Sequence, residues 1–387
     1  MDHSATTPVR ALVTEAMLPF LGGRFGNASS VHSAGREARQ AVEEARETVA
    51  GGLGAAPEEI VFTSGGTESD NFALKGVVAA AERAGKCIVT SAIEHPAVLN
   101  TCAYLAKQGF NVTRLPVNSE GLVEPGELRR VLQAHGGDVV LVSVMMANNE
   151  VGTVQPVREL AAIAHGASAL FHTDAVQAVG KIPVDVDALG VDLLSLSGHK
   201  FYGPKGVGAL YIRRGTRIQP VQHGGHHESN RRAGTENVPG IVGTARALEL
   251  ACAEMDAQAL RLHELRDRLQ QGLLERVPDC RLNGHQERRL PHLLNISFRN
   301  VEGESMLLAL DAEGVCVSTG SACTSGTLEP SHVLTAMGIP PEVAHGSLRF
   351  SLGRDNTREE VEYVLDVLPP IIERLRSMSP FSTQATE

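Results

Sequence analysis

The sequence predicts an α/β protein: a mainly parallel sheet flanked by helices, followed by a smaller α+β region. Three observations predict this. Strand and helix patterns alternate through the first two thirds of the chain. The segments 138–145 and 192–197 are almost continuously apolar, as strands buried on both faces are. A single long helical pattern, 239–277, then separates this region from a shorter and more mixed one.

The first region supplies the elements of the parallel sheet. Apolar residues at helical spacing predict a helix over 34–53, which Gly54 ends. A strand, a turn at Gly65-Gly66 and a helix over 67–84 follow, and Pro96 opens a further helix. The predicted strands of this region are 59–63, 87–93, 112–117, 138–145, 169–173 and 192–197.

The second region carries strands at 293–298, 314–318 and 347–352, a helix over 303–313 and another from Thr357. We place the domain boundary inside the long helix, near residue 255. The large domain is then 14–255. The small domain is 1–13 with 256–387, and it carries a Gly/Ser-rich loop at 318–331.

Composition and charge exclude several classes of protein. The 387 residues carry 35 Lys and Arg against 45 Asp and Glu, so a general attraction to nucleic acid or to an anionic membrane is absent. The longest nearly apolar stretch, 139–147, is far short of the ~20 residues of a membrane helix. The start MDHSATTPVR lacks an apolar signal core, and we expect a cytoplasmic protein.

The cysteines are scattered, without CxxC pairs or Cys/His spacings of a metal site. This usage is typical of a reducing compartment rather than of a disulfide framework. The six are Cys87, Cys102, Cys252, Cys280, Cys316 and Cys323.

Three segments carry residues suited to chemistry, and the first is TSGGTESDN, 63–71. A strand ends, two glycines turn, and a helix begins at Thr67, which exposes backbone N–H groups that can bind one phosphate. The same residues also fit an ordinary turn in which Thr67 and Asp70 form a capping box.

The second is Lys200, which follows the apolar strand ending at Ser197, and the third is Asp174, which ends another. Ligands bind at the carboxyl ends of such strands. A half-buried lysine suits covalent chemistry with a carbonyl, and an acid can pair with the pyridinium nitrogen of pyridoxal phosphate. Taken singly, Lys200 also fits a surface lysine and Asp174 a helix N-cap. Together with the phosphate turn, the two residues fit a pyridoxal phosphate site.

Motifs along nearly the whole chain, from Asp2 to about Pro380, closely resemble the cysteine desulfurases of the IscS/NifS type, in the class-V aminotransferase family. They are SATTP, FGN, FTSGGTESDN, EHPAVL, NNEVGTVQ, DAVQAVGK, SGHKFYGPKGVGALYIRR, RAGTENVPGIVG, STGSACTSGTLEPSHVL and HGSLRFSLGR. The resemblance implies a fold type I pyridoxal phosphate-dependent transferase. It also implies a homodimer whose sites use both subunits.

By this resemblance, Lys200 holds the cofactor covalently, Asp174 pairs with its ring nitrogen and Gln177 with its ring hydroxyl. His95 stacks on the ring and is a candidate proton donor. The implied phosphate ligands are Gly66, Thr67, Ser197, Gly198 and His199, with Thr235 from the other subunit. Asn149 and Arg349 are the implied clamp for the substrate carboxylate, which the planar fork of an arginine suits.

Cys323 lies in STGSACTSG among small polar residues, where an exposed thiolate can form. The resemblance makes it the nucleophile and persulfide carrier, on the long loop typical of one group within the family. Cys316, in GVCVS, has apolar neighbours, and we expect it to be a buried structural cysteine.

The chain departs from the family's pattern in three places. It begins close to SATTP, Ala28 replaces the proline of FGNPS, and His226 in HGGHHES replaces a glycine. Three nearby histidines invite a metal hypothesis, but the matching segment of the family binds none. We therefore expect no resident metal, although Cys323 could transiently ligate a shared iron–sulfur cluster.

The implied reaction converts L-cysteine to L-alanine, with the sulfur kept as a persulfide and passed to an acceptor such as an iron–sulfur scaffold protein. A selenocysteine lyase or an aminotransferase of the same fold is the alternative. Transamination needs no thiol, so Cys323 separates it from the desulfurase. A binding platform for sulfur assembly with only residual catalysis is a further alternative, which the presence of Lys200, Asp174 and Arg349 disfavours. A nicotinamide dehydrogenase fits the α/β pattern but would need a glycine fingerprint that is missing.

Overall fold

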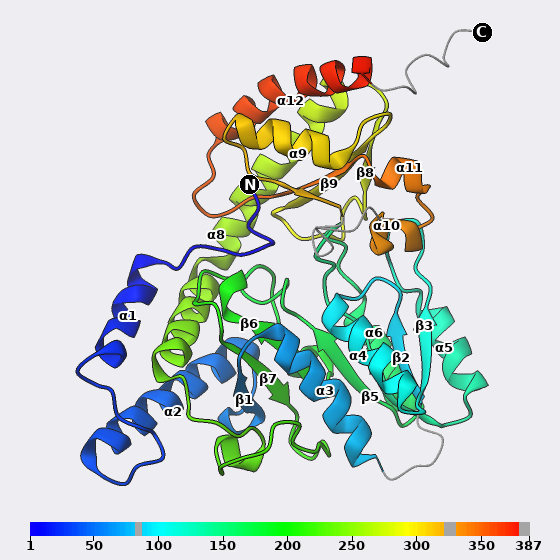
Figure 1. Cartoon of the computed structure of the whole chain (residues 1–387). Coiled ribbons are helices and arrows are strands. Elements are labelled where there is room, and N and C mark those ends of the chain that lie inside the picture. The colour runs from blue at the N-terminus through cyan, green and yellow to red at the C-terminus, as the bar shows by residue number, and fades with distance from the viewer. Residues whose placement is uncertain (82–86, 321–329, 379–387) are drawn as a thin grey trace.

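The computed structural model describes residues 1–81, 87–320 and 330–378. Its first sheet has seven strands in the order β1-β7-β6-β5-β4-β2-β3 (Figure 1). Neighbouring strands from β6 to β3 run parallel, as predicted. The strands are β1 (Ile60–Thr63), β2 (Cys87–Ser91), β3 (Asn111–Leu115), β4 (Val139–Ser143), β5 (Leu170–Asp174), β6 (Leu193–Ser197) and β7 (Gly208–Ile212).

Strand β7 is absent from the sequence prediction and runs antiparallel to both of its neighbours, β1 and β6. It returns directly from the turn that follows Lys200. At its first residue, a Cβ on Gly208 would lie 2.5 Å from the carbonyl oxygen of Leu196 and 2.7 Å from Cα of Gly65. Only glycine allows β7 to lie this close to the turn before α3.

Helices cover both faces of this sheet, as predicted. One face packs against α3 (Gly66–Ala80) and α4 (Pro96–Lys107), with Phe72, Val98 and Leu141 in its core. The other face packs against α2 (Ser33–Leu53), α5 (Pro125–Ala134) and α6 (Val157–Gly166), and its core includes Val42 and Leu160. Helix α2 ends at Gly54, whose φ of 69° is left-handed.

Helix α1 (Ala11–Leu21) packs against α8, and the short α7 (Val186–Leu189) leads into β6. Helix α3 ends at Ala80, before the predicted end at residue 84. In the part of the chain that the structure describes, no helix is both long and apolar enough to cross a membrane.

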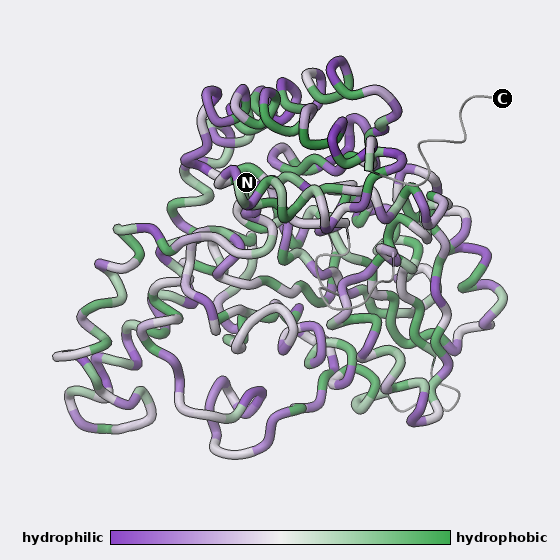
Figure 2. The backbone as a smooth tube through the Cα atoms, turned by 45° about the horizontal axis from the view of Figure 1, so that its top comes forward, coloured by the Kyte–Doolittle hydropathy of each residue, from purple (hydrophilic) through white to green (hydrophobic). Residues whose placement is uncertain are grey.

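The second sheet has four antiparallel strands in the order β10-β11-β9-β8. Helices α9 and α12 pack against each other over this sheet at the top of Figure 1. In Figure 2 the helices at the top alternate between hydrophobic and hydrophilic positions, because one face of each is buried. The elements are β8 (Cys280–Asn283), β9 (Leu293–Phe298), β10 (Ser318–Thr319), β11 (Ser347–Ser351), α9 (Gly303–Ala312), α10 (His332–Ala336), α11 (Pro341–Ala344) and α12 (Arg358–Met378).

Helix α8 (Val238–Arg276) is the long helix that the sequence predicts, and it joins the two sheets. Ile241 and Leu248 in its first half belong to the core of the large sheet. Leu269 and Leu273 in its second half belong to the core of the small sheet. The predicted domain boundary near residue 255 lies between these two sets and remains a prediction.

The N-terminal segment lies along both sheets. The His3 amide donates to the Ser351 carbonyl of β11 at 3.1 Å, and the Thr7 amide donates to the His199 carbonyl after β6 at 3.0 Å. Residues 4–6 therefore cross the space between the two sheets.

Two expectations for the small sheet are wrong. Residues 314–317 form no strand, and β10 begins at Ser318. Cys316 is exposed rather than buried. Val315 and Val317 point inward, each 7% exposed, and the alternation along an extended backbone turns Cys316 outward. Apolar neighbours in the sequence therefore did not imply an apolar environment for the thiol.

Candidate active site

A cavity of about 330 Å³ lies at the carboxyl ends of β5 and β6, beside the small sheet. This is where open α/β sheets bind ligands, and the volume is at the lower end for small-molecule sites. Most of the predicted site residues line it: Gly66, Thr67, His95, Asn149, Asp174, Gln177, Ser197, His199, Lys200 and Arg349. The fold thus gathers residues from six separate segments of the chain.

The glycine turn before α3 forms one end of the cavity. Helix α3 begins at Gly66, and no side chain of the described residues caps its N-terminus. The capping-box interpretation of Thr67 and Asp70 is therefore wrong for this helix. An adjoining hollow of about 310 Å³ shares Gly66 and Thr67 and adds Lys205, a cation that sequence reasoning missed. The turn thus offers free N–H donors and a positive charge to an anion.

Asp174 is the last residue of β5, and its Oδ1 accepts a hydrogen bond from the Val176 amide at 2.9 Å. Burial raises the pKa of this carboxyl, whereas His95 and Lys200 act in the opposite direction. Burial, strand position and the neighbouring Lys200 together suit an acid that pairs with a cationic ring nitrogen.

Lys200 ends the short turn Gly198–Lys200 that follows β6. Its Nζ donates to the carbonyl oxygens of Ser4 and Ala5, at 2.7 and 2.8 Å. Gln177 Nε2 donates to the same Ser4 oxygen at 3.0 Å. The N-terminal segment therefore forms one wall of the site. Ser4 and Ala5 belong to the SATTP motif, but the sequence alone assigned no role to this motif.

His95 is the N-cap of α4, and its Nδ1 accepts from the Ala97 amide at 3.1 Å. The proton of the neutral ring is therefore on Nε2. Burial lowers the pKa of His95, which favours this neutral form. His199, whose Nδ1 lies 3.0 Å from Thr6 Oγ1, has its pKa lowered to about 4 by burial and by the nearby lysines, Lys200 first.

Arg349 on β11 is 2% exposed and reaches the cavity from the small sheet. Its Nη1 donates to the Asn149 carbonyl oxygen at 2.9 Å. Its Nη2 donates to Asp2 Oδ1 at 3.0 Å and to Ser318 Oγ at 3.1 Å. The backbone of Asn149, rather than its side chain, therefore holds the guanidinium in place.

Two predicted residues of the described part of the chain do not line this cavity. Gly198 is buried beside it, where a Cβ would lie 2.7 Å from Thr244 Oγ1. Thr235 is exposed, and the role implied for it needs a second copy of the chain. Cys323 lies outside the described residues.

Asp70 is a lining residue to which sequence reasoning gave no site role. It lies on α3 and is 1% exposed, and no group in the described ranges forms a hydrogen bond with its Oδ1. Burial, with Asp174 and Glu94 nearby, raises the pKa of Asp70 well above its ordinary value. A carboxyl held in its neutral form so close to Asp174 keeps a second negative charge out of the site.

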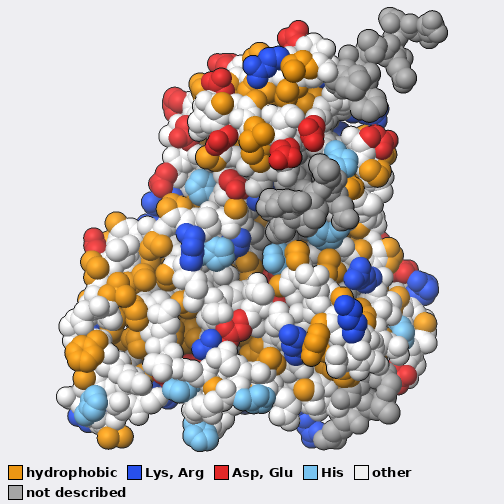
Figure 3. All heavy atoms as spheres, in the orientation of Figure 1, with side chains coloured by type: hydrophobic (Ala, Val, Ile, Leu, Met, Phe, Trp, Pro, Cys, Tyr) orange, Lys and Arg blue, Asp and Glu red, His pale blue; other side chains and the backbone are white. Residues whose placement is uncertain are grey.

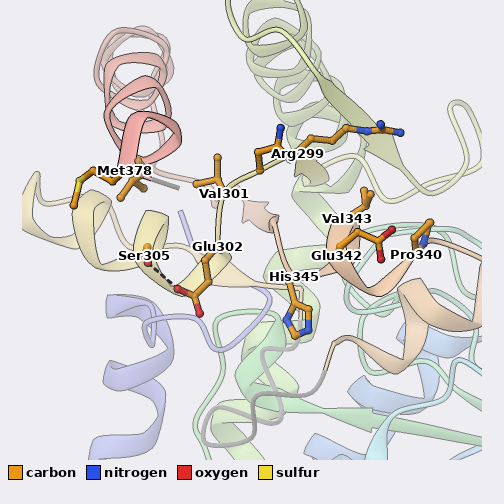
Figure 4. A pocket seen from close by; sticks show the side chains of 11 residues that line it. Arg299, Val301, Glu302, Ser305, Pro340, Glu342, Val343, His345 and Met378 are labelled. Carbon is orange, nitrogen blue, oxygen red and sulfur yellow. Dashed lines mark hydrogen bonds between the residues drawn. The ribbon is translucent and has the colours of Figure 1, made fainter. Parts of the chain in front are cut away.

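Other candidate sites carry less chemistry. A larger cavity, about 800 Å³, lies beside α9, α11 and α12, with Glu302 and His345 in its wall (Figure 4). It is built from elements around the small sheet, away from the ends of the parallel strands. Among the described residues, no three His, Cys, Asp or Glu side chains gather as metal ligands would. His226 Nδ1 instead lies 2.5 Å from Asn230 Oδ1.

Comparison with known proteins agrees with this geometry. The family model described as aminotransferase class-V matches residues 1–364. The chain belongs to the class-V aminotransferase family. Within this family it is similar to the cysteine desulfurase IscS of Dictyoglomus turgidum, with 57% identity over 99% of this chain and 97% of that protein. The IscS of Methanosarcina thermophila is 56% identical, over 99% of this chain and 94% of that protein.

Solved structures of this class-V group have the same fold. A NifS-like protein matches with a TM-score of 0.91 and 44% identity, over 97% of this chain and 99% of that one. SspA in complex with cysteine matches with a TM-score of 0.79 and 36% identity, over 91% and 97%. The chain is therefore an enzyme of the IscS/NifS group with the fold type I architecture that the sequence predicts.

Proposed function

We propose that this enzyme is a pyridoxal phosphate-dependent cysteine desulfurase that converts L-cysteine to L-alanine and keeps the sulfur as a persulfide on Cys323. The observation that carries the proposal is one cavity that holds Lys200, Asp174 and the Arg349 guanidinium next to an uncapped helix start. An amine, an acid, a carboxylate clamp and an anion site are what an amino acid and this cofactor require together.

The side chains fit the cofactor. The N–H groups at the start of α3, with Thr67 and Ser197, would hold its phosphate. Asp174 would hold its ring nitrogen, and Gln177 its ring hydroxyl. When bound, the cofactor withdraws electrons from the substrate Cα and thereby makes its proton acidic.

Lys200 would then act as the base that takes this proton. Its position favours this role, because two backbone carbonyls hold the amine at the cavity wall. His95, with its proton on Nε2, would supply a proton from the other side of the site. Arg349 would orient the substrate through its carboxylate.

The role of Cys323 is supported by the residues that flank the segment 321–329. Before it, Ser318 Oγ accepts from Arg349 Nη2 at 3.1 Å. After it, Ser331 Oγ donates to the buried Glu150 carboxylate, and His332 Nε2 lies 2.9 Å from the Glu94 carbonyl oxygen. The segments before and after 321–329 are thus hydrogen-bonded to residues that adjoin the active site. The Cys323 thiolate would attack the substrate sulfur, and the C–S bond would break as alanine forms.

We further propose a cytoplasmic homodimer. Exposed apolar side chains are concentrated on α1 and the segment after it: Leu12 (44%), Leu18 (56%), Leu21 (65%), Phe25 (81%) and Val31 (88%). Figure 3 shows hydrophobic side chains gathered on the side of the molecule that α1 occupies. A surface of this kind favours contact with another protein. The exposed Thr235 would then reach the phosphate of the other subunit.

The sulfur acceptor in this proposal is an iron–sulfur scaffold protein or another protein thiol. The test is to incubate the purified, cofactor-loaded enzyme with L-cysteine and to measure alanine and sulfide, with and without a candidate scaffold. Lys200→Ala is the matched control and should lose both products together with the visible absorption of the bound cofactor. Normal sulfide production by Lys200→Ala would overturn the assignment.

A further inference from the structure

Lys181 lies directly behind Gln177 and outside the cofactor cavity. Its Nζ donates to Gln177 Oε1 at 2.8 Å, from four residues further along the chain. Lys181 lines a separate space of about 50 Å³ that meets the cofactor cavity only at Lys200. Lys181 can therefore affect the cofactor only through Gln177 or through the charge of its own amine.

The orientation of the Gln177 amide is set from both sides. Its Nε2 faces the Ser4 carbonyl oxygen at 3.0 Å, and a carbonyl can only accept a hydrogen bond. Its Oε1 faces the Lys181 amine, which donates. With one amide hydrogen on Ser4, the second hydrogen of Nε2 is the donor that Gln177 can offer to a ligand in the cavity.

In the part of the chain that the structure describes, Lys181 has no ionic partner to explain its position. Its Nζ donates a hydrogen bond to Gln177, and no carboxylate of the described residues lies within ion-pairing distance of it. Burial lowers the pKa of Lys181 well below its ordinary value, and the charges of Lys200 and Arg349 lower it further. An amine is costly at such a place, so its contact with Gln177 requires an explanation beyond packing.

We propose that Lys181 is a positioning residue that keeps the NH₂ group of Gln177 turned toward the ring hydroxyl oxygen of the cofactor. The inference rests on the proposed function, because it assumes that pyridoxal phosphate binds with this oxygen at Gln177. Without Lys181, the amide loses the contact that holds Oε1 away from the cavity. It can then rotate and bring its own oxygen to the cofactor oxygen.

The expected consequence is spectroscopic. With the cofactor bound, a hydrogen bond from Nε2 would stabilise the negative charge on the ring oxygen. The ring oxygen would then attract less strongly the proton that it shares with the nitrogen bound to Lys200. The pKa that governs the visible band of the bound cofactor is then lowered. Loss of this donor should therefore raise that pKa, by about half a unit to one unit.

The experiment compares variants in the cofactor-loaded enzyme by titrating the visible absorption with pH. Lys181→Met and Lys181→Leu remove the donor, whereas Lys181→Gln removes the charge but keeps an NH₂ donor for Gln177 Oε1. Lys107→Met removes a lysine from the exposed end of α4 and serves as the control. We expect the band of the Met and Leu variants to titrate at higher pH, and that of the Gln and Lys107 variants to titrate as in the wild type.

An equal shift in Lys181→Gln and Lys181→Met would overturn the proposal, because charge rather than the hydrogen bond would then be responsible. No shift in any variant would also overturn it. If Met and Leu lose the cofactor while Gln retains it, the hydrogen bond is again what matters. If the Met, Leu and Gln variants all lose the cofactor, Lys181 acts through packing or charge, and the proposal is overturned. Alanine formation by the wild type, measured first, tests the proposed function separately.

Discussion

The Asp2 carboxylate lies 3.0 Å from Nη2 of Arg349, so the guanidinium proposed to bind the substrate carboxylate already has an anionic partner. Asp2 reaches β11 through the parallel bridge that it forms with Ser351. Arg349 Nε, by contrast, is buried and has no hydrogen-bond partner among the described residues. A substrate carboxylate therefore meets a guanidinium whose charge is partly compensated and whose hydrogen bonding is incomplete.

Asp2→Asn should strengthen cysteine binding. The amide oxygen of asparagine can still accept from Arg349 Nη2, but the negative charge near the substrate carboxylate is gone. We expect KM for cysteine to fall by about 2- to 10-fold, which corresponds to roughly 0.4–1.4 kcal/mol. Steady-state alanine formation at fixed ionic strength measures this. A rise in KM would indicate that the Asp2 charge is needed to present the guanidinium.

Arg349→Ala should mainly weaken cysteine binding. One charge-assisted interaction left unmade costs roughly 1.5–3 kcal/mol, which is about 10- to 150-fold in affinity. Arg349→Lys should recover only part of this loss, because an ammonium cannot reach the Asn149 carbonyl, Asp2 and the substrate with one planar fork. Thermal unfolding of both variants controls for lost packing. An unchanged dependence on cysteine concentration would assign the carboxylate to another residue.

The sequence predicted the parts of the site that lie where apolar strands stop. Lys200 and Asp174 follow the buried runs of β6 and β5, and parallel strands bring their carboxyl ends to one edge. The resemblance to a known family added His95 and Arg349, which local patterns leave ambiguous.

Contacts between distant segments could not be predicted in this way. The Ser4 carbonyl that joins Gln177 and Lys200 comes from more than 170 residues away, and nothing in a local pattern specifies that distance in space. The prediction that Cys316 is buried was wrong for the opposite reason. The local apolar pattern was taken to mean that the thiol is buried, but only Val315 and Val317 point inward.

The buried Glu94 should make stability depend on pH. Burial raises the pKa of Glu94 from 4.5 to about 8, although its Oε1 accepts from Ser91 Oγ and from the Met145 amide. Between these two values the folded state retains a proton that the unfolded state has lost. Stability therefore decreases as pH rises through this window, by at most about 1.4 kcal/mol per pH unit.

Glu94→Gln should remove this contribution, because an amide does not titrate and its oxygen can accept the same two hydrogen bonds. We expect the thermal midpoint of the wild type to fall relative to that of the variant between pH 5 and 8. The exposed Glu304→Gln on α9 is the control and should follow the wild type at every pH. Parallel curves for wild type and Glu94→Gln would contradict the shifted pKa.

Cys323→Ser should separate cofactor binding from sulfur transfer. The groups proposed to bind pyridoxal phosphate and to remove the substrate proton, including Lys200 and Asp174, lie in the cavity described above. Serine has nearly the size of cysteine but an alcohol-like pKa, whereas an unperturbed thiol of pKa ~8.5 is a few per cent thiolate at neutral pH. The variant should therefore bind the cofactor and cysteine, but release neither alanine nor sulfide at a measurable rate.

Cys316→Ser is the matched control, because its thiol is exposed and lies only seven positions earlier in the chain. It should keep its activity and, since no buried contact is lost, also its thermal midpoint. Alkylation followed by mass analysis after incubation with cysteine locates the persulfide in each protein. We expect it on Cys323 in the wild type and in Cys316→Ser, and on no cysteine in Cys323→Ser. A persulfide on Cys316 together with normal alanine release in Cys323→Ser would exchange the roles of the two cysteines, which the exposure of Cys316 makes a direct test.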